Sequence, residues 1–71
     1  MKMYLISDNV DTLTGMRLAG VEGAVVHEKH ELSDALNFVV NNKEIGIVLL
    51  TEKFSKDYPD LVNKYKMESH I

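Results

Sequence analysis

The stretch "IGIVLL", residues 45–50, is an unbroken apolar run that decides the class of fold. A run this short suits a β-strand, and the absence of alternating polar residues is typical of a strand buried on both faces. Such strands occur in parallel sheets, which carry helices on each side. The run therefore predicts a strand of a parallel sheet covered by helices.

Two further apolar or β-branched runs, Met3–Ile6 and the one around Ala24–His27, alternate with longer segments of helical period. This β-α-β-α-β-α pattern predicts a small doubly wound, three-layer α/β fold with a parallel sheet. In flavodoxin-like order the strands run 2-1-3, with residues 45–50 at an edge. The 71 residues leave room for one domain, residues 1–71.

The first helix is expected over Val10–Ala19, with Asp8 or Asn9 as its cap and Gly20 at a left-handed C-terminal end. Its apolar residues gather on one face at helical spacing: Val10, Leu13, Leu18 and Val21. Arg17 projects into the middle of that face. A guanidinium there extends to water, pairs with a carboxylate or contacts a partner, and Arg17 is therefore a candidate partner-binding residue.

The second helix is expected over about Glu31–Asn41, with an apolar stripe of Leu32, Ala35, Leu36, Val39 and Val40. Phe38 lies well off this stripe and is a candidate surface aromatic for partner binding. The last segment has a stripe of Phe54, Tyr58, Leu61, Val62 and Tyr65. Because Pro59 interrupts it, we expect a kink or two short helices, the second opening at Pro59.

Composition excludes several classes of function. The chain has no Cys, 8 basic and 11 acidic residues and a net charge of -3. The sequence lacks the stripe of basic residues that is typical of nucleic-acid binding. No apolar stretch approaches the roughly 20 residues of a membrane-spanning helix. Without Cys there is no disulfide framework or thiolate metal site, which fits a reducing, cytosolic setting.

Glycines and acidic residues near strand ends raise the possibility of a ligand site. A dinucleotide loop needs its glycines between strand and helix, but Gly15 lies inside the first helix and Gly20 and Gly23 follow it. Carboxylates just past the expected strand ends could hold Mg²⁺: Asp8, Asp11, Glu28 and Glu52. Capping and interaction with helix dipoles explain carboxylates at these places better.

The histidines offer no stronger case. In "HEKHE", residues 27–31, His27 and His30 are three apart and straddle a strand end and a loop, unlike zinc ligands on one helix face. A Ser-His-Asp triad could be drawn from Ser7, His27 and Asp8. The choice of these three residues is arbitrary, because the sequence has no nucleophile elbow. We predict no catalytic residue, cofactor site or metal site.

Two stretches carry a family resemblance. "SDNVDTLTGMRLAGV", residues 7–21, resembles the first helix region of the F subunit of V-type and archaeal-type (A-type) rotary ATPases. The matching positions are Asp11, Thr12, Gly15, Arg17, Leu18, Ala19 and Gly20, with Met16 at the aromatic position. "IGIVLLTEKF", residues 45–54, is similar to that family's third strand and the start of its next helix. Together they cover the chain, most weakly between Glu22 and Lys43.

The resemblance implies a non-catalytic subunit of the central rotor stalk of a proton- or sodium-translocating ATPase or ATP synthase. It would bind the coiled-coil D subunit in a cytoplasmic complex peripheral to the membrane. Asp11 and Gly15 would shape a helix start and a close helix–sheet contact, and Arg17 would anchor structure or partner. No residue need contact nucleotide.

Members of this family continue with a fourth strand and a C-terminal helix, whereas this sequence stops at "KYKMESHI". Without that strand, Ile45–Leu50 would be a long apolar edge, which templates pairing with another chain. We therefore expect a missing fourth strand or a borrowed neighbour, and self-association of these residues through Ile45–Leu50.

An alternative from another class is a receiver-like signalling module. Asp8 and Asp11 would form an acidic pair that binds Mg²⁺ for phosphate transfer, with Thr51 beyond a strand. The third strand does not end in an Asp, and the chain is too short for five βα units.

Overall fold

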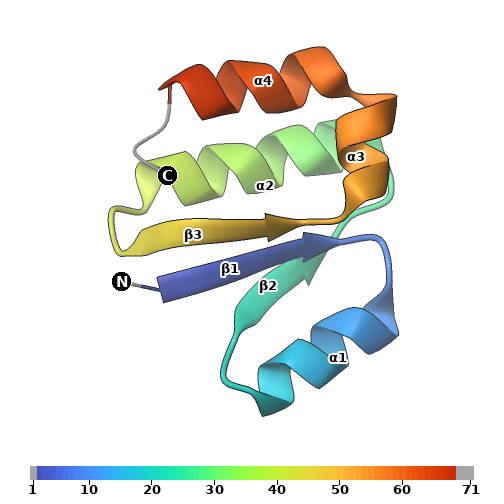
Figure 1. Cartoon of the computed structure of the whole chain (residues 1–71), viewed down its shortest axis with the longest axis vertical. Coiled ribbons are helices and arrows are strands. Elements are labelled where there is room, and N and C mark those ends of the chain that lie inside the picture. Colours follow the sequence, from blue (N-terminus) through green and yellow to red (C-terminus); the bar gives the residue numbers. More distant parts are fainter. Residues whose placement is uncertain (1, 69–71) are drawn as a thin grey trace.

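The computed structural model describes residues 2–68 and has three layers, with helices on both faces of a parallel sheet (Figure 1). The elements in chain order are β1 (Lys2–Ser7), α1 (Val10–Leu18), β2 (Glu22–Val25), α2 (Lys29–Asn41), β3 (Ile45–Leu50), α3 (Glu52–Asp57) and α4 (Pro59–Glu68). This confirms the predicted α/β class. Among the described residues no helix is long and apolar enough to cross a bilayer.

The sheet has the order β2-β1-β3, as predicted, and both pairings are parallel. Lys2 pairs with Ile45 and Met3 with Ile47, so Gly46 is an extra residue in β3. A bulge of this kind changes which face the neighbouring side chains take, and glycine accommodates it readily. Ile45, which precedes the irregularity, is buried, with 2% of its surface exposed.

The second strand lies earlier in the chain than the expected Ala24–His27. Helix α1 ends at Leu18, and Gly20 has a φ of +86°, the left-handed conformation expected after it. That turn lets the chain enter β2 at Glu22, opposite Tyr4. Val26 and His27 follow the strand, although Val26 still donates a backbone hydrogen bond to Ser7 at 2.9 Å.

One face of the sheet carries the core. Helix α2 covers this face and α4 packs on α2, as Figure 1 shows above the strands. The central cluster is drawn from strands and helices: Ile6, Val26, Leu32, Ala35, Leu36, Phe54 and Tyr65. The predicted stripe of α2 is therefore correct, with Leu32 and Val39 at 0% and 1% exposed.

The end of the described chain follows one of the two expectations for Pro59. Helix α3 ends at Asp57 and Pro59 opens α4, so the proline occupies a first helical position where no amide is needed. The predicted stripe holds as well, because Phe54, Val62 and Tyr65 are buried. The Tyr65 hydroxyl donates a 2.6 Å hydrogen bond to Asn37 Oδ1, which ties α4 to α2.

The opposite face carries α1 alone, and two predictions made for this helix are wrong. None of the nine residues of α1 is buried; Val10 and Leu18, expected in an apolar core face, are 60% and 89% exposed. Leu13 and Met16 are half-buried instead. Arg17 therefore lies on an exposed side of the helix and not in a buried stripe.

The close contact between helix and sheet involves a different glycine from the one expected. A Cβ on Gly15 would meet nothing within 4 Å. On Gly23, by contrast, it would collide with the carbonyl oxygen of Leu5 and press on the Leu13 side chain. Gly23 thus allows β2 to lie close to β1 and leaves room for the Leu13 side chain of α1.

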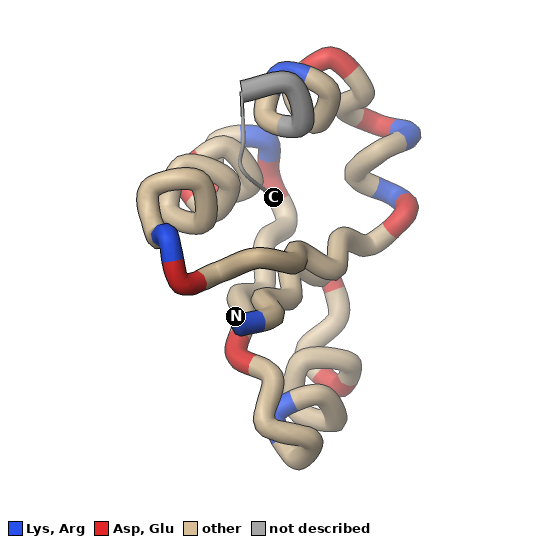
Figure 2. The backbone as a smooth tube through the Cα atoms, turned by 60° about the vertical axis from the view of Figure 1, so that its left-hand side comes forward, with Lys and Arg blue, Asp and Glu red and all other residues tan. Residues whose placement is uncertain are grey.

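Strand β3 is covered on one face only. Ile47 is 41% exposed, as is Met3 on its neighbour β1, so the prediction of burial on both faces is wrong for β3. On its outer side β3 has no partner strand among residues 2–68. Its charged neighbours lie before and after the strand, at Lys43–Glu44 and Glu52–Lys53 (Figure 2). Self-association through this edge stays a prediction.

Candidate functional site

The two residues selected from sequence as partner contacts, Arg17 and Phe38, line one surface depression although they lie on different helices. Its volume is about 580 Å³, and Tyr4, the turn residues 20–21 and the first two residues of β2 complete its lining. We call Tyr4, Arg17, Glu22 and Phe38 together the corner surface. It lies where β1 and β2 begin, away from the edge at which α/β sheets usually bind small ligands.

Phe38 contributes an exposed aromatic ring to the corner surface. It projects from α2 away from the buried stripe and is 52% exposed, as predicted. Its ring packs on Tyr4 of β1, with the centroids 5.4 Å apart and the planes tilted by 46°. This separation falls within the favourable range for aromatic pairs, so the two rings hold each other in place at the surface.

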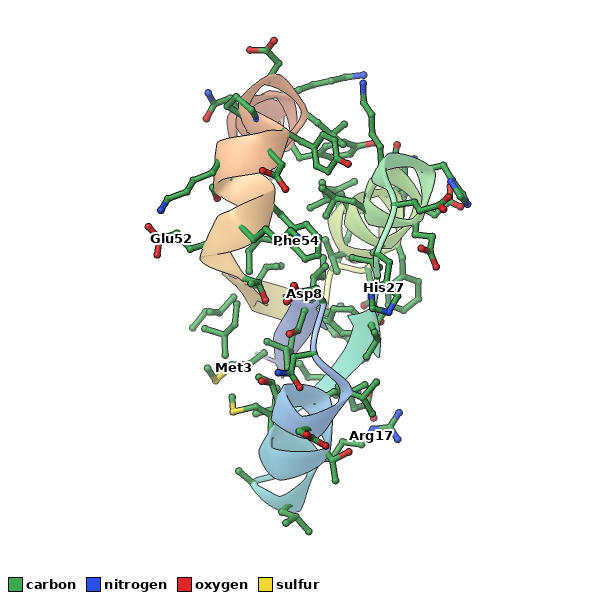
Figure 3. All side chains as sticks on the ribbon, turned by 90° about the vertical axis from the view of Figure 1, so that its right-hand side faces the viewer. Met3, Asp8, Arg17, His27, Glu52 and Phe54 are labelled. Atoms are coloured by element: carbon green, nitrogen blue, oxygen red, sulfur yellow. The ribbon has the colours of Figure 1, made fainter. Side chains whose placement is uncertain are left out.

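The corner surface also carries one charge of each sign. Arg17, in the last turn of α1, extends outward from the helix (Figure 3), and Glu22 opens β2 directly opposite Tyr4. None of the four salt bridges found among the described residues involves Arg17 or Glu22. Of the three roles considered for Arg17, pairing with a carboxylate is therefore not seen among these residues.

Both charges act on the hydroxyl of Tyr4. Partial burial raises the pKa of Tyr4 above its ordinary value of 10.0, and the Glu22 carboxylate raises it further. The Arg17 guanidinium acts in the opposite direction and lowers the pKa. The geometry agrees with these opposing influences, since Tyr4, Arg17 and Glu22 line the same depression.

Two of the carboxylates considered for a metal site lie near lysine side chains. Asp8 lies 3.9 Å from Lys53 Nζ, and Glu52 pairs with Lys56 at 3.5 Å. Asp11 is an exposed residue of the first turn of α1. Within residues 2–68, no group of three or more His, Asp or Glu side chains could hold a metal ion.

The "HEKHE" segment starts a helix. Glu31 accepts backbone hydrogen bonds from His27 and Glu28 at 3.1 and 3.0 Å, which lowers the pKa of its carboxyl group. With Glu28 at the N-cap this forms a capping box for α2. His30 Nδ1 lies 3.4 Å from Glu28 Oε2, so His30 contacts the N-cap residue of the same helix.

The Ser-His-Asp set has no support in the structure. Ser7 is 1% exposed, and its hydroxyl accepts a 3.1 Å hydrogen bond from the Asn9 backbone N–H. Asn9 in turn caps α1, as predicted, by accepting hydrogen bonds from Asp11 and Thr12 at 2.8 and 3.3 Å. These polar side chains build the turn between β1 and α1.

The sequence reasoning missed Tyr4 and Glu22. A tyrosine within a strand combines an apolar ring with a polar tip, which is a signal for a residue at the boundary of a core. Glu22 gave no such signal, because its place opposite Tyr4 depends on the register of β1 and β2.

Comparison with known proteins gives consistent matches. Residues 3–71 match the model of the ATP synthase (F/14-kDa) subunit family. The chain is 38% identical over 66 residues to the F subunit of the A-type ATP synthase of Pyrococcus abyssi (strain GE5 / Orsay), covering 86% of this chain and 63% of that protein. It is 34% identical over 68 residues to the F subunit of the A-type ATP synthase of Thermococcus kodakarensis (strain ATCC BAA-918 / JCM 12380 / KOD1), with 86% and 66% coverage. The chain thus spans just under two thirds of the length of these relatives.

Proposed function

Because the chain belongs to the ATP synthase (F/14-kDa) subunit family, we propose that it is a non-catalytic, central-stalk component of a rotary ATPase or ATP synthase. In this role it turns with the stalk while other subunits make or hydrolyse ATP, and it contributes to coupling that reaction to proton or sodium transport. The observation that carries the proposal is the family match over residues 3–71.

The chemistry of the side chains supports a role without catalysis. Catalytic acids, bases and nucleophiles need accessible groups, often with pKa values shifted toward the working pH. Here Ser7 is buried in a capping turn, and Glu31, whose pKa is lowered, is used in a capping box. Asp8 lies near the ammonium group of Lys53.

The partner in this proposal is the coiled-coil D subunit of the stalk, and Arg17 and Phe38 are the residues proposed to contact it. Both are exposed, both line the same depression, and Arg17 has no salt bridge among the described residues. Aromatic and arginine side chains are enriched among residues that dominate protein–protein binding energy.

A receiver-like, Mg²⁺-dependent phosphotransfer function finds less support. The acidic pair expected for this function is Asp8 and Asp11. Asp8 lies near Lys53, and Asp11 lies in the exposed first turn of α1. Thr51 Oγ1 lies 3.5 Å from the carbonyl oxygen of Ile6, which ties β3 to β1. No specific contact among residues 2–68 favours phosphate transfer over the stalk role.

The test is to mix the purified chain with the cognate D subunit and follow complex formation by size-exclusion chromatography and calorimetry. We expect a stoichiometric complex and no ATP turnover by the chain alone. Incubation with Mg²⁺ and a small phosphodonor is the control for the signalling alternative. ATP turnover abolished by a substitution in this chain, or absence of any complex with the D subunit, would contradict the proposed function.

A further inference from the structure

The corner surface combines an aromatic pair with two opposite charges that find no salt-bridge partner among residues 2–68. Arg17 belongs to α1, Glu22 to β2 and Phe38 to α2, so three elements present these groups together. Charged groups at a protein interface are matched by opposite charges on the partner. The pattern therefore specifies the chemistry of what binds there.

We propose that the corner surface docks one face of a helix that carries a carboxylate for Arg17, a cationic side chain for Glu22, and an apolar side chain for the exposed ring of Phe38. This inference rests on the proposed function, in which the partner is a coiled-coil protein, and names the kind of helical face that the coiled coil must offer.

The presence of Glu22 favours such a mixed-charge face over an anionic ligand. A phosphate, a nucleotide or an acidic membrane would be attracted by Arg17 but repelled by the nearby carboxylate of Glu22. Arg17 and Glu22 line the same depression, so a small anion bound there would be attracted by the guanidinium and repelled by the carboxylate. A partner with both signs satisfies both groups.

A helix supplies the required groups at a suitable spacing. Residues three or four apart on a helix are neighbours, with Cβ atoms roughly 5–6 Å from each other. Coiled-coil helices carry acidic and basic residues of this kind beside their apolar seam. A depression of about 580 Å³ accommodates side chains of one helical turn and not a whole helix, so the contact is a local one.

Charge reversal tests the proposal on the full chain. Arg17→Glu and Glu22→Lys should each weaken the Kd for the cognate D subunit at least about tenfold, because each places like charges against the partner. Lys56→Glu and Asp57→Lys, at exposed positions of α3 near the other end of the sheet, are the matched controls and should leave the Kd unchanged. Circular dichroism and the melting temperature check that every variant is folded.

A cross-linking experiment identifies the chemistry of the partner directly. Since the chain contains no Cys, Phe38→Cys provides a single site for a thiol-reactive photo-cross-linker, and Lys56→Cys provides the control site. Mass spectrometry of the complex with the D subunit should place the Phe38→Cys adduct in a helical segment with a carboxylate and a cationic residue three or four positions apart. An adduct in a segment of one charge sign would overturn the proposed chemistry.

The outcomes separate the two proposals. If the wild-type chain binds the D subunit but neither charge reversal changes the Kd, the corner surface is not the docking site, while the proposed function stands. If the wild-type chain does not bind the D subunit, the proposed function fails and this inference fails with it. Saturable binding of inorganic phosphate or ATP that is lost in Arg17→Glu would show an anion site and overturn the mixed-charge helix.

Discussion

The face of the sheet under α2 and α4 is sealed, whereas the face that carries α1 is partly open. On the sealed face Ile6 and Leu32 are both 0% exposed. On the open face none of the residues of α1 is buried, and Ile47 is 41% exposed. The difference indicates that one face stabilises the fold and that the other leaves apolar surface available for contacts.

The largest effect is expected on the sealed face. Phe54→Ala should lower the free energy of unfolding by about 3–5 kcal/mol, because a ring that is 2% exposed leaves a cavity behind. Leu18→Ala is the matched control on α1, where 89% exposure predicts a change within about 0.5 kcal/mol. Urea unfolding followed by circular dichroism measures both. Similar losses for the two variants would contradict the contrast between the faces.

The contact of α1 with the sheet should be sensitive at one glycine. Gly23→Ala should destabilise the protein by about 1–3 kcal/mol, because the new methyl group meets the backbone of Leu5 and the side chain of Leu13. Thermal melting gives the change. A neutral result would mean that both β1 and α1 can shift away from residue 23 at no cost.

The open face should respond through association rather than folding. Ile47→Lys should reduce self-association of these residues, because it places a charge on the exposed face of the edge strand β3, and should change stability by about 1 kcal/mol or less. Val48→Lys is the contrasting variant and should unfold the domain, since Val48 packs on the core. Sedimentation at matched concentrations provides the readout. A folded wild-type chain that stays strictly monomeric at high concentration would exclude association through this edge.

Substitution of Gly15 should have a small effect on stability, opposite in sign to the effect of substituting Gly23. Gly15→Ala should raise the free energy of unfolding by about 0.5–1 kcal/mol, because the residue lies inside α1 with open space at its Cβ position and a φ that is not positive. Melting of this variant beside Gly23→Ala gives the comparison within one layer. A loss of stability would show that Gly15 does lie in a close contact.

The smallest effect concerns pH. Because the folded-state pKa of Glu31 is lowered from its ordinary value of 4.5, its hydrogen bonds stabilise α2 above pH 4.5. This contribution is lost as the pH falls below 4.5 through the lowered pKa. Glu31→Gln keeps an acceptor that does not titrate and should flatten this part of the acid dependence of melting. An identical acid profile in the variant would assign the acid sensitivity to other groups.

The sequence was most informative where one periodic pattern dominated. The stripe of α2 and the start of a helix at Pro59 follow from local rules. The alternation of strands and helices indicates a doubly wound sheet, and the order 2-1-3 is the flavodoxin-like order of such a sheet. For α1 the pattern misled, because its few apolar residues are spread around the helix and spacing alone did not single out Leu13 and Met16 as the inner side. The close contact at Gly23 could be found only once the strand register was known.

The candidate site was partly predictable for the same reason. Arg17 and Phe38 stood out because each departs from the pattern of its own helix. That they share one depression with Tyr4 and Glu22 depends on contacts between elements distant in the chain, such as the ring pair of residues 4 and 38. Local patterns contain no information on such contacts.

Hydrogen–deuterium exchange of the chain with and without the cognate D subunit tests the central claim most directly, namely that this is a binding protein of the stalk that docks through its corner surface. We expect slower exchange in the complex for peptides that contain residues 16–23 and for those around Phe38, because docking covers both. Peptides from α3 should be unchanged. Protection confined to α3 and the strand ends near Asp8, or no protection anywhere, would contradict the account.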